Sequence, residues 1–171
     1  ANYLKNTIFT PIHVTIGFII AGFLAIYCML ENLYWYAAFF LILKSILDAA
    51  DGDLARLKQK PSYIGRYYDS IADFILNFSF LLTLWYITEI SIIYMILSFL
   101  ALQLQGTLYN YYYVILRNAV KGDSTSRIFE NTKPKALNGE SQLMVNIFYK
   151  IYYVFKIYFY FGWSIFFDYF F

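Results

Sequence analysis

Long apolar runs separated by short polar connections dominate this chain. The runs expected to form helices are Ile8–Leu30, Tyr34–Leu47, Tyr67–Thr88, Ile90–Leu116 and Leu143–Phe161, and another begins after Gly162. A helix needs about 20 mostly apolar residues to cross a bilayer. The second run is short, and it reaches that length if its helix continues through Asp51. The pattern therefore predicts an all-α, polytopic membrane helical bundle.

The composition supports this class. Hydrophobic residues make up 61% of the chain and charged residues 14%, with a mean hydropathy of +0.53. Aromatic residues reach 23%, and this hydropathy and aromatic content exclude an ordinary soluble domain. Cys28 is the only cysteine, which rules out a disulfide within the chain.

Four aspartates interrupt the apolar pattern between the second and third runs. Asp48 and Asp51 are three residues apart, and Asp69 and Asp73 are four apart, so each pair shares one face of a helix. Carboxylates beside a bilayer are costly and mark functional sites. Hard oxygen ligands suit Mg²⁺, Mn²⁺ or Ca²⁺. Two acidic faces opposed across the turn Leu57–Ile64 predict a two-metal site of the kind that clamps the oxygens of a phosphoryl displacement. Charged helix ends in a solvated loop are the simpler alternative.

Three neighbouring residues add to this chemistry. Gly52 lets a ligand approach the backbone closely. Arg56 offers a cationic fork for phosphate. Lys44, one helical turn before Asp48, either balances the acidic cluster or meets a donor phosphate.

The spacing of these residues is D-x2-D-G-x2-A-R-x8-G-x3-D-x3-D. It resembles the signature of the CDP-alcohol phosphotransferase (CDP-alcohol phosphatidyltransferase) family of integral membrane enzymes. All eight fixed positions are matched, by Asp48, Asp51, Gly52, Ala55, Arg56, Gly65, Asp69 and Asp73. The resemblance implies about six transmembrane helices, of which the one after Gly162 is incomplete here. It also implies a single membrane domain over residues 1–171 and a homodimer.

The resemblance further implies an activity. Such an enzyme transfers a phosphoalcohol group from a CDP-linked donor to an alcohol hydroxyl during phospholipid biosynthesis and releases CMP. By this resemblance, two Mg²⁺ or Mn²⁺ ions would be held by Asp48, Asp51, Asp69 and Asp73, and Asp73 would be the general base. The nucleotide donor would be bound by Asp48, Gly52, Ala55, Arg56, Gly65 and Asp69.

The acceptor is indicated by the residue after the fourth aspartate. In branches that resemble phosphatidylinositol-phosphate and phosphatidylglycerol-phosphate synthases, a basic residue commonly stands there, whereas this chain has Phe74. We therefore expect an unphosphorylated acceptor, such as serine or a lipid hydroxyl. Basic residues that could still contact an acceptor or phosphate are Lys44, Arg66, Arg127 and Lys133.

Basic residues also predict the orientation. They fall in alternate connections, as Lys5, then Arg56, Lys58, Lys60 and Arg66, then Arg117, Lys121, Arg127, Lys133 and Lys135. The connections near Glu31 and Glu89 carry no Lys or Arg. The positive-inside rule then places the basic connections, and the aspartate motif, at the cytoplasmic face. The bias reports topology, and no nucleic-acid partner is expected.

Two other functions remain open from the sequence. A membrane prenyltransferase also uses aspartates and Mg²⁺ to bind a diphosphate, although the Gly52, Ala55, Arg56 and Gly65 positions have no role there. A divalent-cation transporter would place carboxylates near the bilayer midplane. Asp48 lies about 21 Å along the helix from Tyr34 at 1.5 Å per residue, towards the cytoplasmic side.

Overall fold

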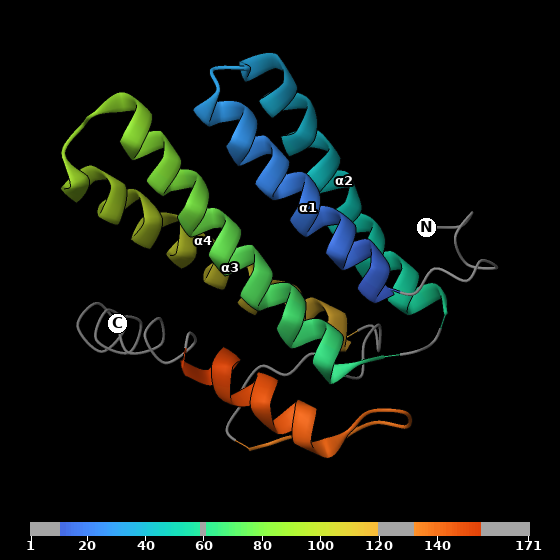
Figure 1. The fold of residues 1–171 in the computed structure, drawn as a ribbon. Coiled ribbons are helices and arrows are strands. Elements are labelled where there is room, and N and C mark those ends of the chain that lie inside the picture. The colour runs from blue at the N-terminus through green and yellow to red at the C-terminus, as the bar shows by residue number, and fades with distance from the viewer. Residues whose placement is uncertain (1–10, 59–60, 120–131, 155–171) are drawn as a thin grey trace, which may run out of the picture. The chain divides into compact units, whose positions relative to one another are not determined.

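The computed structural model describes residues 11–58, 61–119 and 132–154, and within these ranges the chain is helical without strands. Its labelled helices are α1 (Pro11–Leu30), α2 (Tyr34–Leu57), α3 (Tyr63–Thr88) and α4 (Ile92–Ala119), shown in Figure 1. Residues 142–154 form a further helical segment. The all-α prediction is confirmed. The count of six stays a prediction, because the run after Gly162 lies outside the described residues.

Helix α2 continues past the apolar run that predicted it. It extends for 24 residues to Leu57 and therefore carries both Asp48 and Asp51. Helix α3 begins at Tyr63, earlier than the predicted Tyr67. Pro61 precedes it, and proline is unfavourable inside a helix. Ser62 then caps the first turn, since its Oγ accepts a hydrogen bond from the Gly65 N–H at 2.8 Å.

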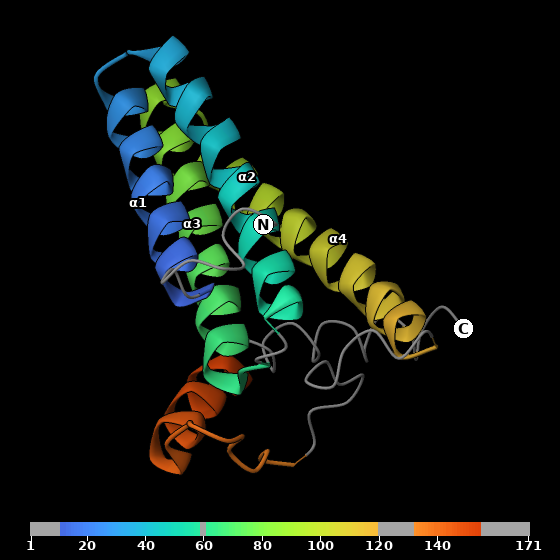
Figure 2. The same ribbon diagram turned by 90° about the vertical axis from the view of Figure 1, so that its right-hand side faces the viewer.

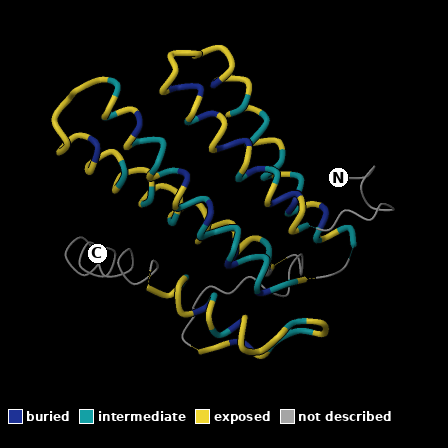
Figure 3. Tube along the Cα trace, in the orientation of Figure 1, coloured by how far each residue is buried: buried dark blue, intermediate teal, exposed yellow. Residues whose placement is uncertain are grey.

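Three described helical stretches are long and apolar enough to cross a membrane: Pro11–Leu30, Tyr63–Thr88 and Ile92–Arg117. Most of their surface is not covered by the described chain. In the most apolar window of the third stretch only 6% of residues are buried, and Figure 3 shows exposed positions along both α3 and α4. Apolar side chains exposed at this density need a hydrocarbon environment. Together with the composition, this identifies a membrane protein.

The chain divides into two compact units, with one boundary inside α3 after Ile71 and another inside α4 after Phe99. The first unit contains Ala1–Pro61 and Ala72–Phe99, and the second contains Ser62–Ile71 and Leu100–Phe171.

In the first unit, α1 and α2 form an antiparallel hairpin, seen side by side in Figures 1 and 2. Its turn contains Asn32 with a φ of 60°, a left-handed conformation that asparagine tolerates better than most residues. A core cluster of Phe18, Ala72 and Leu76 joins α1 to α3. A Cβ added at Gly22 would lie 2.7 Å from the Leu76 side chain, so this glycine permits a close approach. The packing fixes which face of α3 meets the hairpin.

In the second unit, aromatic side chains join the start of α3 to the 142–154 segment. Tyr63, Tyr67, Val145 and Tyr149 form its buried cluster. The ring centroids of Tyr67 and Tyr149 are 6.0 Å apart in an edge-to-face arrangement, a favourable geometry for aromatic pairs. This packing anchors the first turns of α3, where Gly65 and Asp69 lie.

Candidate metal and phosphate site on helices α2 and α3

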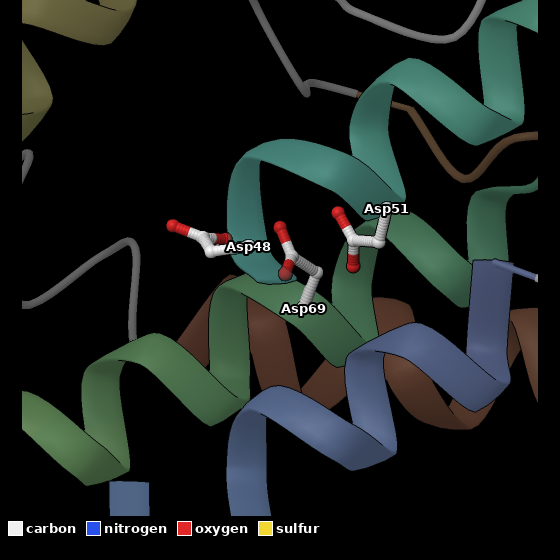
Figure 4. A group of neighbouring side chains, drawn as sticks. All are labelled: Asp48, Asp51 and Asp69. Carbon is white, nitrogen blue, oxygen red and sulfur yellow. The ribbon is translucent and has the colours of Figure 1, made fainter. Parts of the chain in front are cut away.

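Three of the four motif aspartates provide neighbouring carboxylates. One oxygen from each of Asp48, Asp51 and Asp69 lies within 4.8 Å of the others. Figure 4 shows the first two side chains on α2 and the third on α3, with the Asp69 carboxylate between those of Asp48 and Asp51. Three close carboxylate oxygens fit a divalent cation that prefers oxygen ligands. The donor set therefore matches the Mg²⁺ or Mn²⁺ predicted from the spacing.

Asp51 is positioned by helix α1. Its exposed fraction is 7%, and the Thr15 hydroxyl donates a hydrogen bond to its Oδ2 at 2.6 Å. The same hydroxyl lies 3.1 Å from the Pro11 carbonyl oxygen. Thr15 had no role in the sequence-based prediction. Its hydroxyl in an apolar run was the only signal, and the contact spans 36 residues of sequence.

Asp73 is held by a lysine of helix α2. Lys44 Nζ lies 2.6 Å from Asp73 Oδ1, and the two side chains are 12% and 33% exposed. The ammonium also lies 5.2 Å from the centroid of the Phe18 ring, which stabilises a cation electrostatically. Of the two roles predicted for Lys44, the structure shows contact with the acidic cluster.

Burial makes the α2 carboxylates hard to ionise. Desolvation raises the pKa of Asp48 to about 6; the Asp73 carboxylate raises it further, while Lys44 opposes the shift. Burial also raises the pKa of Asp51, and the hydrogen bond from Thr15 lowers it in part. A divalent cation would offset this cost because it attracts the ionised forms.

The remaining motif residues of α2 lie at its exposed end. Arg56 donates to the Asp53 carboxylate within an i,i+3 ion pair, and both side chains are well exposed. A Cβ at Gly52 would lie 3.8 Å from the Arg56 guanidinium, so the guanidinium lies across the open face of this glycine. Ala55 is half-buried. Asp53, outside the fixed motif positions, is the partner that orients Arg56.

Gly65 lies in a hydrogen-bonded cap at the start of α3. Glu140 Oε1 accepts hydrogen bonds from the Ser62 hydroxyl at 2.7 Å and the Ile64 N–H at 3.0 Å, and Oε2 accepts one from the Leu137 N–H at 3.1 Å. A Cβ at Gly65 would lie only 3.2 Å from Ser62 Oγ. The glycine therefore keeps the cap compact. Ser62 and Glu140 had no role in the sequence-based prediction.

The three other basic residues predicted to contact an acceptor or phosphate differ in what the structure shows of them. Arg66 lies over two rings, 5.5 Å from the Tyr67 centroid and 6.0 Å from that of Tyr152. Lys133 is exposed. Arg127 lies outside the described residues. Among these three, Arg66 is the cation whose orientation the structure fixes.

A family model for CDP-alcohol phosphatidyltransferase matches residues 8–166. The chain belongs to this family. Members transfer a phosphoalcohol group from a CDP-alcohol in phospholipid synthesis, so the chain is a membrane transferase of this class with a CDP-alcohol donor and an alcohol acceptor. Family members commonly use divalent metals, which agrees with the three neighbouring carboxylates. No match was found among curated proteins or among solved structures.

Family membership also decides between the functions left open by the sequence. The matched region includes the complete motif and nearly all the predicted helices. The matched family is one of CDP-alcohol phosphatidyltransferases, not of prenyltransferases or transporters. The family assignment therefore favours the transferase over both alternatives.

Proposed function

We propose that this chain transfers a phosphoalcohol (phosphatidyl-type) group from a CDP-linked donor, which carries either the lipid or the headgroup, to an unphosphorylated alcohol and releases CMP. The observation that carries this proposal is the group of carboxylate oxygens from Asp48, Asp51 and Asp69, with Asp73 one turn further along α3. The match of residues 8–166 to the family supports the same reaction class.

The α2 and α3 aspartates divide into two roles in this proposal. Asp48, Asp51 and Asp69 hold the divalent cation. Asp73 lies next to this group and has a different role. When bound, Mg²⁺ or Mn²⁺ supplies positive charge that neutralises a pyrophosphate and stabilises the departing CMP. Arg56 binds donor phosphate, and Gly52, Ala55 and Gly65 leave backbone space for the nucleotide.

Asp73 is the proposed general base. The acceptor hydroxyl oxygen forms a bond to the phosphorus that is transferred, and the bond from that phosphorus to the CMP phosphate oxygen breaks. The hydroxyl proton moves to a carboxylate oxygen of Asp73. Asp73 is one-third exposed, so an acceptor can reach it, and the Lys44 contact fixes its orientation.

The residue next to the base supports an unphosphorylated acceptor. The Phe74 ring packs edge to face against Phe99, with centroids 5.2 Å apart, so this position is apolar. A phosphate dianion needs charged or multiply hydrogen-bonding partners. Serine or a lipid hydroxyl requires less compensation and suits this surface better.

The basic connections support placing the site at the cytoplasmic face, where a nucleotide donor is available. We further propose that residues 1–171 act as one membrane domain and that the chain is a homodimer, as the family resemblance implies. Crosslinking in native membranes would test the dimer independently of the chemistry.

An acceptor competition tests the proposed substrate. Purified chain with Mn²⁺ would be given serine, glycerol phosphate, inositol phosphate or diacylglycerol, each with its matching CDP donor. We expect transfer to serine or diacylglycerol and little transfer to either phosphorylated acceptor. Preferential use of a phosphorylated acceptor would overturn the acceptor assignment and point to Arg66, Arg127, Lys133 or Lys135 as the phosphate contact.

A further inference from the structure

Lys44 is a mostly buried cation within a largely apolar stretch of α2. Its side chain is 12% exposed, between the Phe18 ring of α1 and the Asp73 carboxylate of α3. An unpaired buried ammonium would be strongly unfavourable, so the contact with Asp73 is what makes this position tolerable. All three residues belong to the same compact unit.

This contact competes with the metal-ligand role that the family resemblance implies for Asp73. Lys44 Nζ occupies hydrogen-bonding space at Asp73 Oδ1. A divalent cation bound at that oxygen would meet the ammonium at short range, and two positive charges repel strongly where water is scarce.

We propose that Lys44 is a built-in counter-cation that keeps Asp73 out of metal coordination until the donor binds. This inference rests on the proposed function. Asp48, Asp51 and Asp69 then form the part of the site that takes the first divalent ion. A second ion gains Asp73 only when Lys44 moves away. The flexible four-carbon stem of a lysine allows that movement, and a donor phosphate is the anion to which the ammonium would turn.

Lys44 is thus a positioning residue with two consequences. Before the donor binds it holds the carboxylate of Asp73 in one orientation, and it makes the full metal complement depend on the donor. The second consequence distinguishes it from a purely structural lysine, because removing a structural ion pair does not strengthen metal binding.

The test is Mn²⁺ binding to the metal-stripped full chain without donor, measured from the electron paramagnetic resonance signal of free Mn²⁺. Lys44→Met keeps the length of the stem beside Phe18 and removes the charge. We expect the parent chain to bind one ion tightly, and the variant to bind a second at least about tenfold more tightly than the parent does. Lys44→Arg should resemble the parent.

The exposed Lys150 provides a matched control, and Lys150→Met should bind Mn²⁺ like the parent. A misfolded Lys44→Met chain would bind less metal, which is opposite to the expected change and would count against the proposal. Unchanged binding in Lys44→Met would overturn the role of Lys44. CMP release by the parent chain is a separate measurement. If the parent releases CMP, the proposed function stands even when the role of Lys44 is overturned. If the parent releases no CMP from any CDP-linked donor, the proposed function itself is contradicted.

Discussion

Thr15 Oγ1 donates a hydrogen bond of 2.6 Å to Asp51 Oδ2, joining α1 to the second aspartate of the motif. The contact is buried, with Thr15 3% and Asp51 7% exposed. It lowers the pKa of Asp51 against the effect of burial. Helix α1 therefore contributes to the charge state of a carboxylate that the proposed function assigns to metal binding.

Replacing this hydroxyl tests its contribution. Thr15→Val keeps the shape of the side chain and removes the donor, so the pKa of Asp51 should rise and the ionised form should become less favourable. Hydrogen bonds to charged groups contribute about 1.5–3 kcal/mol, so we expect Mn²⁺ affinity to fall roughly tenfold or more. Thr15→Ser retains the hydroxyl and should bind Mn²⁺ nearly as the parent does. Equal affinity in all three chains would contradict the role of Thr15.

Helices α2 and α3 show which features of the site local sequence patterns can predict. The apolar runs and the aspartate spacing together suggested that Asp48 and Asp51 lie towards the end of one helix and Asp69 and Asp73 near the start of the next, and the structure has both pairs on such helices. The continuation of α2 through Asp51 was expected because the apolar run was too short to cross a bilayer.

The supporting contacts could not be predicted in this way. Glu140 contacts Ser62 across 78 residues of sequence, and Lys44 contacts Asp73 across 29. Such contacts depend on which helix faces meet, and packing such as that of Phe18 with Leu76 decides this. Helical periodicity shows that a face exists, but it does not identify the side chain opposite.

Removing the divalent metal should abolish activity. The charge of the acidic cluster and that of a pyrophosphate repel each other, so donor binding needs cations between them. We expect no CMP release after metal stripping with EDTA, and recovery when Mg²⁺ or Mn²⁺ is added back. Full activity of the stripped chain would exclude the metal-dependent reaction.

Two aspartate variants should separate the base from a ligand. Loss of a general base typically lowers the rate by about 10² to 10⁴, so Asp73→Asn should reduce kcat on that scale while donor affinity is largely retained. Asp51→Asn should weaken Mn²⁺ and donor binding together. Steady-state kinetics and Mn²⁺ titration measure the two effects separately. Turnover of Asp73→Asn at the parent rate would show that Asp73 is not the base.

The cap on α3 should contribute to stability. Glu140→Ala removes the acceptor for the Ile64 N–H and the Ser62 hydroxyl, and loss of a helix cap costs about 0.5–2 kcal/mol. We expect a lower midpoint of thermal unfolding in detergent, because the first turn of α3 loses its anchor. Glu31→Ala, at an exposed turn position, is the control and should leave the midpoint unchanged. A midpoint in Glu140→Ala equal to that of the control would show that the cap does not stabilise the fold.

The most direct test of the whole account is the stoichiometry of CMP release. The purified chain in lipid nanodiscs would be supplied with Mn²⁺, a CDP-linked donor and an unphosphorylated alcohol, and CMP would be measured together with the lipid product. The account predicts one CMP for each product molecule, dependent on the acceptor and absent in Asp51→Asn. CMP release without a matching phosphoalcohol product, or none with any CDP-linked donor, would contradict it.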